Sequence, residues 1–222
     1  MTKIQEQIRT FLDTEQYKVK TDMCRIFLEK GSDKSSWHNY TTLYDCLFSQ
    51  FINKNINFFE LGLGTNNVNI ASNMGKDGTP GASLYAFREY FKDANICGAD
   101  IDKDILFEDD NIWTFYVDQT DPDSVKKLWD CFDDTEFDII IDDGLHQFEA
   151  NKTFFENSID MLKEGGIYII EDIILEHKQN FIDYLSEKNL QYFNVLELPM
   201  DSSWTESGRV NTIDNCVAII IK

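Results

Sequence analysis

Basic residues, prolines and long apolar runs are all scarce in this sequence of 222 residues. It has only three prolines, and this scarcity together with a hydrophobic content of 42% excludes a disordered or collagen-like chain. Lys and Arg number 20 against 40 Asp and Glu, which gives a formal net charge of −20. A surface this acidic repels nucleic-acid phosphates and anionic lipid headgroups. We therefore expect neither a nucleic-acid partner nor a membrane partner.

The sequence also lacks paired cysteines and a hydrophobic leader. Its five cysteines are scattered and form no Cys-x-x-Cys pair, which argues against a zinc site and against a disulfide framework. Residues 1–20 contain no apolar segment typical of a secretion signal, and no stretch reaches the ~18 apolar residues of a membrane span. Together these absences predict a cytoplasmic protein.

Strand and helix patterns alternate from residue 55 to the end of the sequence. Several of the expected strands are uninterrupted apolar runs, which are typical of strands buried on both faces of a parallel sheet. The expected strands are 57–61, 96–99, 114–117, 137–141, 167–170, 192–196 and 216–221, and the helices between them are 83–92, 123–131, 149–162 and 178–187. This alternation predicts an α/β fold with a Rossmann-like, doubly wound sheet of seven strands, mostly parallel with an antiparallel last strand.

The first 55 residues have a helical pattern instead. Apolar residues spaced for a helical stripe occur within residues 1–30 and again within residues 43–51. We therefore expect an N-terminal helical cap and substrate-covering segment, residues 1–55, ahead of a main domain, residues 56–222. The residues expected to face a substrate lie in 31–50, 71–82 and 199–212, and those singled out are His38, Tyr40, Tyr44, Trp204 and Arg209.

A glycine-containing turn follows the first expected strand. Gly62 and Gly64 allow the backbone to turn sharply and to approach a ligand closely. The next strand ends at Asp100, and the one after it ends at Asp118 and Gln119. These ends meet at the edge where open α/β sheets bind ligands, and a carboxylate there suits ribose hydroxyls. The pattern favours an adenosine-containing cofactor, with a plain tight turn and solvated strand ends as the alternative.

Acidic residues also end two apolar runs in the second half of the chain. Asp142 and Asp143 close one run, and Glu171 and Asp172 close the next. If the two runs are neighbouring parallel strands, their tips lie about 4.8 Å apart and the carboxylates converge. A hard cation such as Mg²⁺ or Mn²⁺ relieves the repulsion between them. His146 lies beside this cluster and can take a proton from a substrate hydroxyl, whereas the alternative is a solvated acidic patch with a helix-terminal histidine.

Taken together, these motifs resemble the class I S-adenosylmethionine-dependent methyltransferases. The shared segments are residues 60–64, 98–102, 117–122 and 162–166. The more specific segments PGASLYAFREYF, IDDGLHQ and GGIYIIEDI are similar to those of the metal-dependent sugar O-methyltransferases of macrolide biosynthesis and of relatives described as cephalosporin-hydroxylase-like. The resemblance covers residues 31–222.

The resemblance implies an S-adenosylmethionine-binding domain at residues 56–222 and methyl transfer to a hydroxyl of a small sugar-like acceptor, in carbohydrate biosynthesis. It implies Mg²⁺ or Mn²⁺ as a second cofactor. Matched by position, the cofactor residues are Glu60, Gly62, Gly64, Asn66, Asp100, Ile101, Asp118, Gln119 and Asp142. The implied metal ligands are Asp143, Glu171 and Asp172, and the implied catalytic residues are His146, as general base, and Asp143.

Three other functions stay open from the sequence. One is a metal-independent methyltransferase that acts on another small metabolite, for example a phosphorylated one. Another is a nicotinamide-dependent oxidoreductase, although Asn67 stands where the third glycine of a dinucleotide-binding motif is expected. The third is a non-catalytic module that keeps the fold as a binding surface. The oligomeric state is open as well, with a homo-oligomer docked through the N-terminal helices as one alternative.

Overall fold

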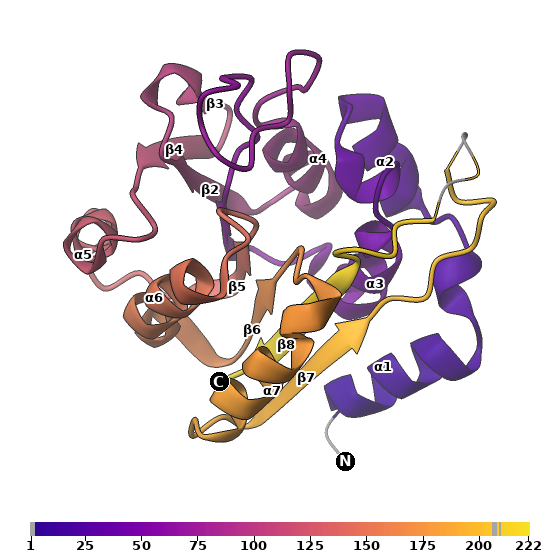
Figure 1. Ribbon diagram of the computed structural model, residues 1–222. Coiled ribbons are helices and arrows are strands. Elements are labelled where there is room, and N and C mark those ends of the chain that lie inside the picture. Colours follow the sequence, from indigo (N-terminus) through magenta and orange to yellow (C-terminus); the bar gives the residue numbers. More distant parts are fainter. Residues whose placement is uncertain (1–2, 206–207, 209) are drawn as a thin grey trace.

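The computed structural model describes residues 3–205, 208 and 210–222, and it is built on one mixed sheet of eight strands (Figure 1). The strand order across the sheet is β3-β4-β2-β1-β5-β6-β8-β7. Neighbours from β4 to β6 pair in parallel, whereas β3 is antiparallel to β4, and β8 is antiparallel to both β6 and β7. The strands are β1 (Asn57–Leu61), β2 (Asn95–Asp100), β3 (Glu108–Asp109), β4 (Ile112–Tyr116), β5 (Phe137–Asp142), β6 (Leu162–Ile170), β7 (Tyr192–Glu197) and β8 (Cys216–Ile221).

The predicted fold class is confirmed, with two local differences. The sheet has eight strands instead of seven, because the two exposed residues of β3 add a short antiparallel edge that is too short to show a pattern. Strand β6 begins at Leu162, five residues earlier than expected, and Leu162 pairs with Phe137. The helix predicted at 149–162 accordingly ends at Ser158. Two successive glycines inside β6 gave its first half the pattern of a turn.

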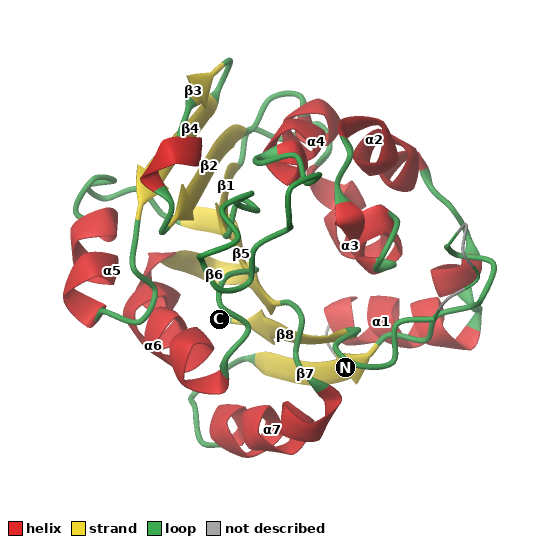
Figure 2. Cartoon of the chain, turned by 45° about the horizontal axis from the view of Figure 1, so that its top comes forward, coloured by secondary structure: helices red, strands yellow, loops and turns green. Residues whose placement is uncertain are grey.

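Helices cover both faces of the sheet (Figure 2). Alternate residues along each strand point to opposite faces, so that Phe58 belongs to one buried cluster and Phe59 to the other. The first cluster lies under α1 (Lys3–Asp13), α2 (Asp22–Lys30), α3 (Tyr40–Phe48) and α4 (Ala82–Phe91). The second lies under α5 (Pro122–Trp129), α6 (Phe148–Ser158) and α7 (Lys178–Ser186).

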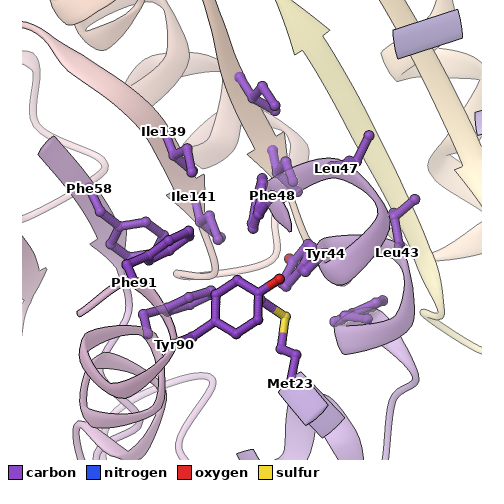
Figure 3. Packing of buried hydrophobic residues seen from close by; sticks show 14 of the residues in the cluster. Met23, Leu43, Tyr44, Leu47, Phe48, Phe58, Tyr90, Phe91, Ile139 and Ile141 are labelled. Atoms are coloured by element: carbon purple, nitrogen blue, oxygen red, sulfur yellow. The ribbon is translucent and has the colours of Figure 1, made fainter. Parts of the chain in front are cut away.

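The N-terminal helices share their core with the sheet (Figure 3). Phe11 of α1 is fully buried in the cluster that also contains Phe58 of β1. Phe58 packs against Phe87 of α4 with a centroid separation of 4.2 Å, and Phe48 of α3 stacks on Tyr44 at 5.1 Å. Residues 3–48 are therefore packed into the first cluster, and a substrate-covering role for residues 1–55 stays a prediction.

The order of the strands leaves a crevice at one edge of the sheet. From β1 the chain first builds one side of the sheet through β2 and β4, and it then returns to place β5 on the other side of β1. Connections that leave in opposite directions open a ligand-binding crevice at the carboxyl ends of the two strands. Residues 62–81, which connect β1 to α4, contain only turns and lie over this edge. In the part of the chain that the structure describes, no helix is both long and apolar enough to cross a bilayer.

Candidate active site

A cavity of about 360 Å³ lies at the carboxyl ends of the central strands. Its walls come from the turn after β1, the ends of β2, β5 and β6, the segment after β4, and the N-terminal segment between α2 and α3. The predicted site residues that line it are Gly62, Gly64, Asp100, Ile101, Asp118, Gln119, Asp143, His146, Glu171, Asp172 and His38. The fold therefore brings most of the expected site residues together around one cavity.

The turn after β1 has a backbone that only glycine fits. Gly62 has a φ of +92°, and a β-carbon on it would lie 1.9 Å from the carbonyl oxygen of Asp143. The Gly62 N–H donates to the carbonyl of Ala99 at 2.8 Å, while the Asp143 N–H donates to the carbonyl of Leu61 at 2.9 Å. The turn is thereby held against both β2 and β5, and it forms the floor of the crevice.

The carboxylate of Asp100 organises the same floor. One of its oxygens accepts the Leu63 N–H at 2.7 Å, and the other accepts the Asp102 N–H at 2.8 Å. Asp118, after β4, accepts both the N–H and the hydroxyl of Thr120. Both carboxylates face the cavity and keep lone pairs for a ligand.

Three other predicted cofactor residues, Gln119, Asp142 and Asn66, bond to other groups of the protein, and of the three only Gln119 lines the cavity. The side-chain amide of Gln119 donates to Asp142 at 2.9 Å, and its carbonyl accepts the Leu145 N–H at 2.7 Å, so that both ends of the amide are used within the protein. Asp142 is fully buried, and burial raises its pKa to about 6. Asn66 donates to two carbonyls of the loop over the crevice, those of Gly75 and Gly78.

His146 lies against two carboxylates of the acidic cluster. Its Nε2 is 3.1 Å from Oδ1 of Asp143 and 3.7 Å from Oδ2 of Asp172. Burial by itself lowers the pKa of the imidazole, but the hydrogen bond to Asp143 and the nearby negative charges outweigh it and raise the pKa to about 10. His146 and Asp172 have φ values of 57° and 53°, a left-handed conformation that side-chain-bearing residues seldom adopt outside special sites.

Sequence reasoning missed Lys34, which lies in the centre of the cluster. Its ammonium is 2.7 Å from Glu171 and 3.2 Å from Glu60, and it also contacts Asp143. Burial raises the pKa of Glu60 to about 7, against the lowering effect of Lys34. For Asp143, Lys34 and His146 overcome burial and lower the pKa to about 2. The only available signal was that buried carboxylates need a cation, and that argument does not say which lysine supplies it.

Three of the expected substrate residues do not line the cavity, and two of them, both tyrosines, support the cluster from outside it. The Tyr40 hydroxyl donates to Asp172 at 2.6 Å, and the Tyr44 hydroxyl donates to Glu171. Trp204 is buried and donates its indole N–H to a backbone carbonyl at 2.7 Å. His38, in contrast, lines the cavity with its Nε2 3.5 Å from Asp172. Arg209 lies outside the described residues.

The expected metal ligands do not gather as a single triad. Oxygens of Asp143 and Asp172 lie within 4.8 Å of each other and of His146, and Asp143 lies as close to Glu171 and Glu60 in a second group. Both oxygens of Glu171 are engaged, one by Tyr44 and one by Lys34. The Asp143–Asp172 pair faces the cavity and offers the hard oxygen donors that Mg²⁺ prefers. A divalent cation therefore fits at this pair.

Comparison with known proteins gives relatives in sequence and in fold. The chain is 32% identical over 146 residues to 8-demethyl-8-alpha-L-rhamnosyl tetracenomycin-C 2'-O-methyltransferase of Streptomyces olivaceus, which is 66% of this chain and 36% of that protein. It is 31% identical to demethylmacrocin O-methyltransferase of Streptomyces fradiae, over 62% of this chain and 32% of that protein. The match thus spans about a third of each curated relative. No family model matches the sequence.

Among solved structures, the methyltransferase MycE of the mycinamycin biosynthetic pathway, in complex with Mg and SAH, superposes with a TM-score of 0.68. The superposition covers 98% of this chain and 61% of that one at 23% identity, and at that identity it shows the fold. A putative caffeoyl-CoA O-methyltransferase from Staphylococcus aureus gives a TM-score of 0.52 at 16% identity. The resemblance expected from the motifs is confirmed: the chain has the class I methyltransferase fold and is similar in sequence to O-methyltransferases named for rhamnosyl tetracenomycin-C and for demethylmacrocin.

Proposed function

We propose that the protein is an S-adenosylmethionine-dependent O-methyltransferase. The observation that carries this proposal is that His146, Asp143 and Asp172 open into the same 360 Å³ cavity as the glycine turn and Asp100. A proton acceptor, two metal-type carboxylates and a nucleoside-type crevice thus meet in one place. The sequence similarity to sugar O-methyltransferases supports the same reaction class.

In this proposal, different residues of the crevice bind different parts of the cofactor. In the proposal, Gly62 and Gly64 give the methionine part its close approach, and Asp100 accepts hydrogen bonds from the ribose hydroxyls. Ile101 is 45% exposed, and together with Asp118 it offers an apolar and polar rim for the adenine. The remaining assigned cofactor residues, Glu60, Asn66, Gln119 and Asp142, hold these groups in position.

The acceptor hydroxyl is deprotonated by His146 in this proposal. Asp143 keeps Nε2 of the imidazole at the cavity, and the raised pKa keeps this atom protonated at neutral pH in the metal-free protein. A divalent cation on Asp143 and Asp172 would polarise the acceptor oxygen and offset the negative charge that holds the proton on His146. Much of the rate would come from holding the acceptor oxygen in line with the methyl group inside a closed site.

The acceptor we propose is a hydroxyl of a small sugar or sugar derivative, and the role is in carbohydrate biosynthesis in the cytoplasm. Two of the similar proteins are named as O-methyltransferases of rhamnosyl tetracenomycin-C, and a third is named as mycinamicin VI 2''-O-methyltransferase. His38 and Trp37 line the same cavity as His146, and Trp37 is 45% exposed, which suits a sugar ring that stacks on an indole. We also propose that the protein self-associates through its N-terminal helices. Analytical ultracentrifugation would test this by measuring the mass in solution.

Calorimetric titration tests this function directly. We expect S-adenosylhomocysteine to bind with micromolar affinity and NADH to give no heat. Mg²⁺ should give a separate signal that Asp143→Asn removes and that Asp110→Asn, an exposed control on the β3–β4 turn, leaves in place. Absence of S-adenosylhomocysteine binding in the folded wild-type protein would refute the proposal and favour the oxidoreductase or the non-catalytic module.

One observation favours a second candidate, a methyltransferase that needs no metal. The Lys34 ammonium already neutralises part of the acidic cluster without a bound ion. Methyl transfer that continues undiminished in EDTA would establish this candidate, whereas loss of transfer in EDTA and recovery on addition of Mg²⁺ would exclude it.

A further inference from the structure

Lys34 is a buried cation inside the set of residues that the fold offers to a divalent ion. Its side chain is 3% exposed, and its ammonium contacts three carboxylates, those of Glu60, Asp143 and Glu171. It lies on the short helical turn Asp33–Ser35 that follows α2, where the Ser32 side chain accepts the Lys34 N–H. Lys34 is therefore held in place by backbone geometry as well as by charge.

The oxygens of the cluster are divided between Lys34 and the open cavity. Asp143 gives Oδ2 to Lys34 and keeps Oδ1 beside His146 at 3.1 Å. Glu171 gives Oε2 to Lys34 and accepts the Tyr44 hydroxyl on Oε1, so that both of its oxygens are committed. Asp172 contacts no lysine in the described structure, and its two oxygens lie near His146, His38 and Tyr40.

We propose that Lys34 is a built-in cation that keeps Glu171 away from the divalent ion and sets the affinity of the site for it. This inference rests on the metal-binding part of the proposed function. An ammonium and a divalent ion repel each other, and they compete for the same Asp143 carboxylate. With Lys34 in place, the ion is held by Asp143 and Asp172, and Glu171 serves as the counter-charge of Lys34. Lys34 is thus a positioning residue, because it acts on the ion through carboxylates.

A double-mutant cycle tests how the carboxylate oxygens are divided between Lys34 and the divalent ion. Mn²⁺ binding is measured by electron paramagnetic resonance for the wild-type chain, Lys34→Met, Glu171→Gln and the double variant, without acceptor. We expect Glu171→Gln alone to change the Mn²⁺ affinity by less than about threefold, and Lys34→Met to tighten it at least about a hundredfold. In the Lys34→Met background Glu171 is released to the ion, so Glu171→Gln should there weaken binding about tenfold. An equal effect of Glu171→Gln in both backgrounds would overturn the inference.

The double variant keeps the test decisive if Lys34→Met alone fails to fold. It removes one positive and one negative charge together, and its Mn²⁺ affinity should exceed that of Glu171→Gln because the competing ammonium is gone. An unchanged affinity between these two proteins, or no Mn²⁺ binding in any of the four, overturns the inference. S-adenosylhomocysteine binding, measured on the same samples, separates this failure from failure of the methyltransferase function, because cofactor binding survives the first and not the second.

Discussion

At the scale of single residues, the environment of His146 determines what the site can do. The imidazole faces Asp143 and Asp172 and carries a pKa of about 10 in the absence of a metal. A histidine held in its protonated form cannot accept a proton, so His146 can act as the proposed base only when the negative charge around it is offset. The His146 proton is therefore coupled to whatever binds the carboxylates.

Replacement of His146 by Gln should separate catalysis from cofactor binding. Gln keeps a hydrogen-bond donor for Asp143 but cannot take a proton at neutral pH. We expect turnover to fall by about 10²–10⁴, while S-adenosylhomocysteine binds as in the wild type. Steady-state assays of methyl transfer, paired with calorimetry, measure both quantities. Full activity in the variant would remove His146 from the mechanism.

The raised pKa of His146 also predicts how the stability of the folded protein depends on pH. The pKa of His146 rises from 6.5 to about 10 on folding, so the imidazolium stabilises the folded state fully below pH 6.5 and loses this effect as the pH rises toward 10. In EDTA, the difference in melting temperature between wild type and His146→Gln should therefore be largest near pH 6 and should shrink by pH 9.5. A difference that stays constant over this range would contradict the assigned environment of His146.

Residue-scale prediction from the sequence succeeded where neighbours in the chain become neighbours in space. Asp143 and His146 are three residues apart at one strand end, and this spacing sufficed to place them together. The pairing of Lys34 with Glu171 joins residues 137 positions apart. Nothing local in the sequence around Lys34 marks it as buried, so only the assembled fold identifies the cation.

At the scale of elements, the turn after β1 fixes the position of the site. Its backbone approaches Asp143 so closely that Gly62 has no room for a β-carbon. The central strands were predictable because uninterrupted apolar runs of strand length are typical of strands buried on both faces of a parallel sheet. The short β3 and the early start of β6 were not, since tertiary pairing and not local pattern determines them.

Substitution of Gly62 by Ala should be far more damaging than the same change at Gly75. Both glycines have positive φ, +92° and +72°, so both variants incur the cost of about 1 kcal/mol for a left-handed alanine. Only at Gly62 would the new β-carbon collide with the Asp143 carbonyl, whereas nothing lies within 4 Å at Gly75. We expect Gly62→Ala to lower the free energy of unfolding by several times the ~1 kcal/mol of the control and to abolish S-adenosylhomocysteine binding.

Urea denaturation and calorimetry on both variants measure these effects. Equal losses of stability in the two proteins would show that the contact between Gly62 and the Asp143 carbonyl does not determine the turn. Retained cofactor binding in a folded Gly62→Ala protein would show that the turn is not the floor of the cofactor site.

At the scale of the whole molecule, the N-terminal helices and the sheet form one packed body. Phe11 of α1 is completely buried in the cluster that contains strand residues from β1, β2, β5, β6 and β8. The sequence indicated the apolar stripe of this helix but not its partner, because an amphipathic pattern says which face is buried and not against what. Residues 3–48 should therefore unfold together with the sheet.

The variant Phe11→Ala tests whether the N-terminal helices and the sheet unfold together. Removal of a fully buried phenylalanine should cost about 3–5 kcal/mol, whereas Val19→Ala, at a side chain that is 57% exposed, should change stability by less than about 0.5 kcal/mol. Urea unfolding followed by both tryptophan fluorescence and circular dichroism should shift as one transition in Phe11→Ala. Two separate transitions, or an unshifted midpoint, would mean that the N-terminal helices fold independently.

The position of Lys34 has a consequence for the order in which the protein matures. During synthesis the lysine emerges 109 residues before Asp143 and 137 residues before Glu171. Its ammonium stays hydrated until the later strands have formed, because only the carboxylates at their ends supply the negative charge that allows the ammonium to be buried. The N-terminal segment can thus complete its docking only late on the ribosome, and a chain arrested before residue 171 would lack one of the three carboxylates that allow Lys34 to be buried.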